Sequence, residues 1–138
     1  EADSLLASLT SDSSYYDEAA AYLNKIIDLG WATYSVYMNL ALMYGADERY
    51  DESFATYDEV IKQYGESYPP YKNMALLEAQ RQSGFENDSR DYSDFNEYYT
   101  KAKELFATSG VAGDMDMDMQ RLEQIYISLK DLGWLNQN

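Results

Sequence analysis

Apolar residues recur along the chain at spacings of three and four, which is the pattern of helices that bury one face. The clearest stretch is residues 34–46, where the predicted apolar face consists of Tyr37, Leu40, Ala41 and Tyr44. A second one closes the chain, with a face made of Met115, Met119, Leu122, Ile125, Tyr126, Leu129 and Leu132. Gly133 ends this last helix, and we expect Trp134 and Leu135 to fold back over its end. The whole pattern predicts an all-α protein with seven helices.

The helical pattern also repeats at a fixed distance of 34 residues. Tyr-Asp-Glu-Ala at residues 16–19 returns as Tyr-Asp-Glu-Ser at 50–53, and Ala7, Ala41 and Ala75 are separated by the same distance. We expect Ala41 to lie where two paired helices cross closely, because a larger side chain would push their axes apart. The repeat therefore predicts successive pairs of helices.

The second of these repeats resembles the tetratricopeptide repeat (TPR), whose period is about 34 residues. The resemblance is carried by Asn39, Leu40, Ala41, Tyr44, the tetrad at 50–53, Tyr57 and Val60. It implies a TPR-like α-α superhelix of three helix-turn-helix repeats, at about residues 1–33, 34–67 and 68–109, followed by a C-terminal capping helix at about 114–132. We expect residues 1–138 to form one such domain, and the start at Glu1 leads us to expect a fragment of a longer protein.

One segment departs from the repeat. Tyr92 lies eight residues after the position equivalent to Tyr50, so residues 83–91 are an insertion between the third pair of helices. The polar and turn-forming residues of the insertion predict a solvated surface connection. A contact role for Phe85 or Arg90 is the alternative, because insertions in repeat proteins cluster on one face.

Composition and charge remove several classes of function. With 10 Lys and Arg against 25 Asp and Glu, the net charge of −15 has the wrong sign for nucleic acid or anionic lipid. The chain has no Cys and no His, which excludes thiol chemistry and the commonest general base and metal ligand. Residues 29–46 are uncharged but contain too many polar and flexible groups for a membrane span. We therefore expect no catalytic residues, no cofactor, no enzymatic activity and no membrane insertion by this segment.

Three alternating carboxylates, Asp114, Asp116 and Asp118, are spaced like the first ligands of a calcium loop. The sixth and twelfth positions of such a loop need Gly and Glu, but Met119 and Ile125 occupy them. Acidic residues are also favoured in the first turn of a helix by its dipole. We therefore predict the start of the last helix here and no metal site.

The TPR resemblance also implies where a partner would bind. In that family the first helices of successive pairs line a concave face that binds an extended or helical peptide. By register, that face presents Ser8, Ser35, Met38, Asn39, Leu42, Lys72, Asn73, Leu76 and Gln80. Because the acidic residues lie mostly outside residues 34–46, we expect a groove of apolar, hydroxyl and amide character and a mildly polar or apolar ligand segment.

These observations predict a non-catalytic protein-protein interaction module whose partner is a protein or peptide. A looser resemblance links residues 91–95, 97–99, 119–122 and 133–135 to the C-terminal TPR regions of Gram-positive bacterial signalling proteins, including serine/threonine kinases. It implies a regulatory or docking region of a larger bacterial protein, cytoplasmic itself, with a membrane-anchored parent as an alternative. A self-associating scaffold is the third hypothesis, since the ends of a repeat stack expose apolar surface.

Overall fold

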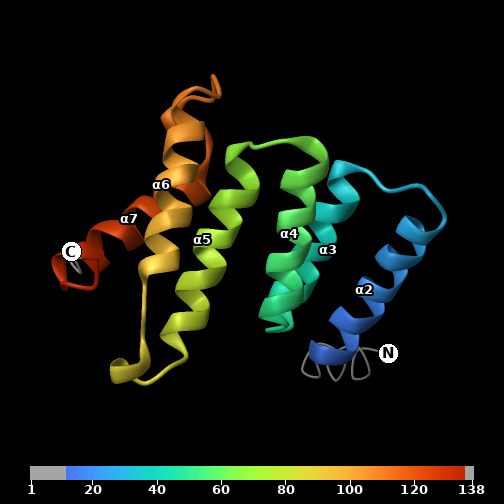
Figure 1. Cartoon of the computed structure of the whole chain (residues 1–138), viewed down its shortest axis with the longest axis horizontal. Coiled ribbons are helices and arrows are strands. Elements are labelled where there is room, and N and C mark those ends of the chain that lie inside the picture. The colour runs from blue at the N-terminus through green and yellow to red at the C-terminus, as the bar shows by residue number, and fades with distance from the viewer. Residues whose placement is uncertain (1–11, 136–138) are drawn as a thin grey trace, which may run out of the picture. The chain divides into compact units, whose positions relative to one another are not determined.

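The structure, a computed structural model, describes residues 12–135. These residues form six α-helices and no strand: α2 (Asp12–Asp28), α3 (Tyr34–Ala46), α4 (Tyr50–Tyr64), α5 (Tyr68–Ser83), α6 (Ser93–Ala107) and α7 (Met117–Asp131) (Figure 1). Two short 3-10 helices, η1 (Asn87–Ser89) and η2 (Gly113–Met115), lie in the connections. The predicted all-α class is confirmed for this part of the chain. The predicted first helix, with Ala7, lies outside the described residues.

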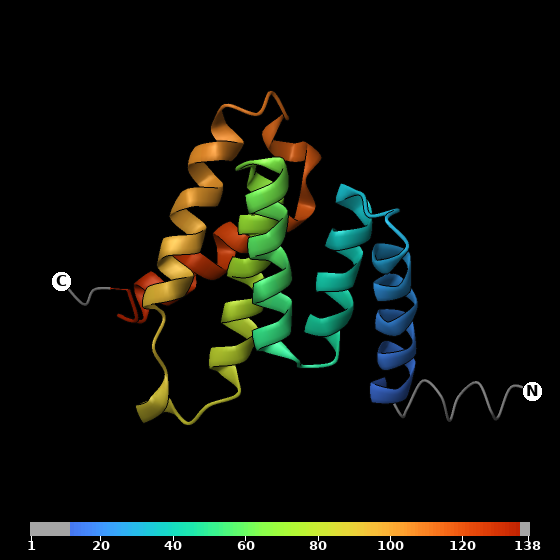
Figure 2. The same ribbon diagram turned by 45° about the vertical axis from the view of Figure 1, so that its right-hand side comes forward.

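The helices divide into two compact units, Glu1–Tyr64 and Gly65–Asn138. In the first unit α3 lies between α2 and α4 and packs against both (Figure 2). In the second unit α5 packs against α6, and α7 contacts both of these helices. Each unit therefore has its own set of packed helices.

Local sequence signals explain where the helices of the first unit begin and end. Gly30 has a φ of 83° and ends α2, where its N–H donates to the Ile27 carbonyl at 2.9 Å. This left-handed conformation is one that glycine adopts without a steric penalty. Thr33 then caps α3, because its hydroxyl accepts a hydrogen bond from the Val36 N–H at 3.2 Å.

The core of the first unit contains the close helix contact that the repeat predicts. Ala41 of α3 is fully buried, and the hydroxyl of buried Ser53 on α4 donates to the Ala41 carbonyl at 2.7 Å. Tyr57 and Val60 of α4 are buried as well. Ala75 of α5, one repeat later, is fully buried in the second unit. The two alanines thus occupy equivalent buried positions, as their spacing predicts.

Stacked aromatic rings form the core of the second unit. Tyr99 of α6 stacks on Phe95 at 6.2 Å and on Tyr126 of α7 at 4.2 Å between ring centroids. Trp134 packs edge-on against Tyr92 at 5.3 Å, and both Trp134 and Leu135 contact this core. The prediction that the chain folds back after the last helix is therefore confirmed.

The predicted apolar face of the last helix is only partly correct. Met119, Leu122 and Leu129 are buried, but Met115 and Leu132 are each 73% exposed. The reason is the position of the helix ends, because α7 begins at Met117 and its C-cap is Leu132. Met115 therefore lies in η2, before the helical face begins.

The insertion at residues 83–91 is a surface connection, as predicted, but hydrogen bonds hold it in place. The Gln82 side chain is buried, and its amide oxygen accepts from the Asp91 N–H at 2.8 Å. The Gln82 amide nitrogen donates to the fully buried carboxylate of Glu78 at 2.7 Å. Arg90 donates to the Ser83 and Phe85 carbonyls, both at 2.9 Å. These hydrogen bonds hold Asp91 against the end of α5 and hold Arg90 against residues 83 and 85 at the start of the loop.

The contact between α3 and α4 gives a test of the fold. Ala41→Leu should lower the free energy of unfolding by about 1–3 kcal/mol, because the larger side chain overfills a buried helix contact. Ala55→Leu, at an exposed position of α4, should change it by less than about 0.5 kcal/mol. Urea unfolding followed by circular dichroism measures both, and equal effects would contradict the described packing.

Candidate functional site

The face of α3 predicted to bind a partner is accessible over much of its length. Ser35 and Asn39 are exposed, Met38 is half-buried and Leu42 is 46% exposed. The spacing of these four residues places them on one side of the helix, and the buried residues of α3 are instead Leu40, Ala41 and Gly45. Within residues 12–135, the side chains of Ser35 and Asn39 make no hydrogen bond, so their polar atoms are available to a ligand. No charged residue occurs in α3.

The four predicted residues of α5 have more varied surroundings. Asn73 and Leu76 are half-buried, Lys72 is mostly buried, and Leu76 packs against the core of the second unit. Gln80 is exposed. The predicted site is thus divided between the units, with four residues on α3 and four on α5, while Ser8 lies outside the described residues.

The ammonium group of Lys72 is held by the start of α7. It lies 3.1 Å from an Asp116 carboxylate oxygen, and both side chains are only 13% exposed. The Tyr68 hydroxyl donates to the same oxygen of Asp116 at 2.9 Å. The other Asp116 oxygen caps α7 by accepting from the Met119 N–H at 3.1 Å. This cluster fixes the first turn of α7 to α5.

The surroundings of Asp116 favour its charged form. Burial opposes ionisation, but the hydrogen bonds from the Met119 N–H, the Tyr68 hydroxyl and Lys72 together outweigh it. The pKa of Asp116 therefore lies below its ordinary value. Among the three alternating aspartates, Asp116 thus acts as a helix cap, and Asp118 is half exposed with its carboxylate 3.9 Å from Lys72.

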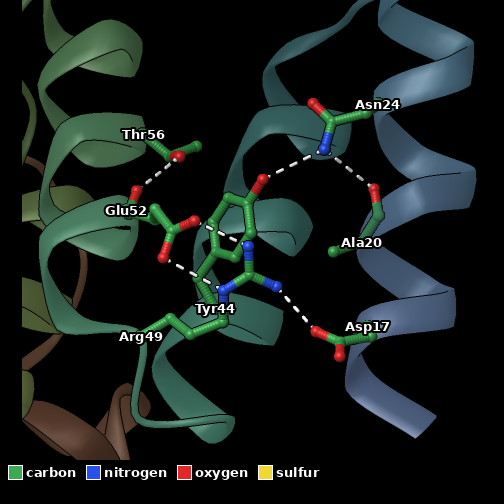
Figure 3. A network of polar contacts seen from close by, with 7 residues as sticks. All are labelled: Asp17, Ala20, Asn24, Tyr44, Arg49, Glu52 and Thr56. Atoms are coloured by element: carbon green, nitrogen blue, oxygen red, sulfur yellow. Dashed lines mark hydrogen bonds and ion pairs between the residues drawn. The ribbon is translucent and has the colours of Figure 1, made fainter. Parts of the chain in front are cut away.

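A second polar cluster joins all three described helices of the first unit (Figure 3). The Arg49 guanidinium makes two hydrogen bonds with Glu52, at 3.0 and 2.6 Å, and one with Asp17 at 2.7 Å. It also lies over the Tyr44 ring, 4.7 Å from the centroid, and the Tyr44 hydroxyl accepts from Asn24 at 3.0 Å. Arg49 thus connects α2 and α4 to the end of α3.

The pKa values of this cluster follow from its hydrogen bonds. The bonds with Glu52 raise the pKa of Arg49 against a smaller opposing effect of burial. The same bonds hold the pKa of Glu52 below its ordinary value. Both groups stay charged around neutral pH, and the cluster keeps the end of α3 in a fixed position between its neighbours.

Neither cluster is predicted above from the sequence, although the sequence contains part of the signal for each. Asp116 precedes Met119 by three residues, which is the N-cap pattern, and Tyr68 and Lys72 lie four apart on one side of α5. Nothing local links the two segments, because Lys72 and Asp116 are 44 residues apart. Arg49 lies among Asp47, Glu48, Asp51 and Glu52 in the sequence, so its pairing with Asp17, 32 residues away, has no local signal.

The described residues were also compared with two common kinds of site, a metal site and a membrane span. Residues 12–135 contain no group of three or more carboxylates arranged to hold a metal ion. None of their helices combines the length and the apolar character that crossing a membrane requires. Neither a protein-family model nor a curated relative matches the chain. The functional proposals therefore rest on the geometry of the residues described above.

The Lys72–Asp116 pair predicts a pH dependence of stability. A group with a lowered folded pKa stabilises the protein above its unfolded pKa, about 3.9 for aspartate, and that stability is lost as the pH falls through the folded pKa. Asp116→Asn should cost about 1–2 kcal/mol at pH 7, since asparagine still caps the helix but cannot pair with Lys72. This cost should shrink steadily below about pH 4.

Urea unfolding of both proteins between neutral and acid pH measures the difference. Asp118→Asn is the matched control, because its carboxylate is half exposed and at the distance limit of an ion pair. A cost for Asp116→Asn that stays constant down to pH 3 would contradict the assigned role of its charge.

Proposed function

We propose that the chain is a TPR-like helical repeat protein, non-catalytic, that binds a protein or peptide segment through the exposed face of α3. The single observation that supports this best is the apolar surface that α3 leaves open. α3 has no charged residue, and Leu42 on the side opposite its buried residues is 46% exposed. Half-buried Met38 and exposed Ser35 and Asn39 lie on the same side of the helix, and together with Leu42 they form the proposed contact surface.

The arrangement within each unit supports the repeat interpretation. α3 begins at Tyr34 and α5 at Tyr68, one predicted period of 34 residues later, and each is followed by a second helix that packs against it. Ala41 and Ala75 take the same buried position in their respective pairs. These paired helices support the proposal of a TPR-like solenoid, in which similar helix pairs follow one another along the chain.

The chemistry of the α3 face defines the partner. Met38 and Leu42 offer apolar contact, and the Asn39 amide can both donate to and accept from a peptide backbone. A partner that buries this face desolvates no charge on α3, because the helix has none. The best-fitting ligand is therefore an uncharged, partly apolar peptide segment, bound by side-chain contact and by hydrogen bonds to Asn39.

The predicted residues of α5 belong to the second unit, and the proposed α3 site does not include them. Lys72 is paired with Asp116, so its charge is already compensated and its role is to hold α7. Asn73 and Gln80 supply amide groups of the same kind as Asn39. We therefore expect substitutions on α3 to affect binding more than substitutions at Lys72.

The proposal is tested by selecting ligands without assuming their sequence. Peptides chosen from a random library by the wild-type protein should bind the Met38→Glu, Leu42→Glu double variant about tenfold more weakly or worse, because the new carboxylates would be desolvated at an apolar contact. Calorimetry measures the affinities, and the NMR spectra of the peptide complex should show shifts at residues 35–42.

The matched control adds the same charge elsewhere. Ala55 and Val111 are exposed and lie outside α3, so the Ala55→Glu, Val111→Glu variant should retain its affinity within about twofold. Circular dichroism verifies that both variants keep their helices. Selected peptides that bind all three proteins equally would refute the α3 site.

A further inference from the structure

The second unit contains a surface groove of about 930 Å³ that the proposed function does not use. It runs along α6, and its walls include Tyr71 of α5, Tyr98 of α6 and Leu135 beyond α7. Its volume is within the range of about 300–1,000 Å³ that is usual for ligand sites. The groove therefore combines aromatic and apolar walls with one polar helix surface.

Charged residues follow one another along the α6 side of this groove. Asp94, Glu97, Lys101 and Glu104 are spaced by three and four residues, so they form a single stripe along the helix. Lys101 is the one cation among them, and Glu66 already compensates it at 3.1 Å. No ion pair or hydrogen bond to another residue of the described chain involves the carboxylates of Asp94, Glu97 and Glu104.

We propose that this groove binds a short basic segment of a partner protein in which Arg alternates with apolar residues. The cations of such a segment would meet the uncompensated carboxylates of α6, and its apolar side chains would contact Tyr71 and Leu135. From Asp94 to Glu104 the helix rises about 15 Å, which is the length of four or five residues of extended chain. The occupant is therefore a short stretch of extended peptide.

Arginine fits this groove better than lysine. The planar guanidinium binds a carboxylate with two parallel hydrogen bonds and also stacks on aromatic rings, which the tyrosine walls supply. The net charge of −15 attracts any cation from a distance, and the groove adds a stripe of carboxylates that faces aromatic and apolar walls. A purely apolar peptide is disfavoured, because it would desolvate three carboxylates without pairing them.

The experiment uses a fluorescein-labelled peptide of sequence Arg-Leu-Arg-Leu-Arg and measures its anisotropy with the full chain. The Glu97→Gln, Glu104→Gln variant should bind it about tenfold more weakly, since two of the three free carboxylates are lost. The control, Glu18→Gln with Asp28→Asn, makes the same change of net charge at exposed sites on α2. It should stay within about twofold of the wild type.

Two further peptides separate the groove from general attraction. Replacing each Arg by Glu should abolish binding, and replacing each Leu by Gly should weaken it severalfold, because the walls lose their apolar contacts. Equal losses in the two protein variants, or an unchanged affinity of the Gly peptide, would overturn the groove and leave only the attraction of an acidic protein. No binding to the wild type would also overturn it. The Met38→Glu, Leu42→Glu variant should bind the basic peptide as tightly as the wild type does. The α3 site and the α6 groove are therefore tested independently.

Discussion

Two helices can approach each other only as closely as the smallest side chain at their contact allows, and the architecture of both units depends on this constraint. At Ala41 the α3 backbone comes close enough for the Ser53 hydroxyl on α4 to reach a main-chain carbonyl. A buried hydroxyl needs such a partner, because leaving it unsatisfied would cost about 1–3 kcal/mol. The small residue and the hydroxyl therefore depend on each other. In the second unit, Ala75 keeps the same buried position while Phe95 fills the space on α6.

The two proposed surfaces have opposite character because charge is distributed unevenly over the helices. α3 has no Asp, Glu, Lys or Arg, whereas the exposed side of α6 has the carboxylates of Asp94, Glu97 and Glu104. The α6 groove would reject an apolar ligand, because its carboxylates would be desolvated without a partner. The α3 face would reject a basic ligand, because its charges would be unpaired there. If both proposals hold, the difference in charge between α3 and α6 separates the two classes of partner.

Much of the fold could be predicted from local sequence patterns, but much of the candidate site could not. The period of 34 residues places the starts of α3 and α5 correctly, because the same apolar spacing recurs around Ala41 and Ala75. The last helix was predicted to begin at about residue 114, but α7 begins at Met117. The reason is that Asp116 is its N-cap, so the apolar residue Met115 lies before the helix. The pairing of Lys72 with Asp116 depends on how distant helices pack, and no local pattern contains that information. The accessible α3 residues were predicted by register, yet their exposure could be known only from the packed structure.

The insertion at residues 83–91 has a consequence for how this kind of protein can change over time. Its backbone is held at Asp91 by the Gln82 side chain and at Ser83 and Phe85 by Arg90, and the Asp91 carboxylate accepts from Ser93 at the start of α6. These contacts fix both ends of the insertion and leave its tip exposed. Changes of length or sequence at its exposed tip would be absorbed before they reach the aromatic core of α6. The connection between α5 and α6 can therefore acquire new surface while the two helices keep their register.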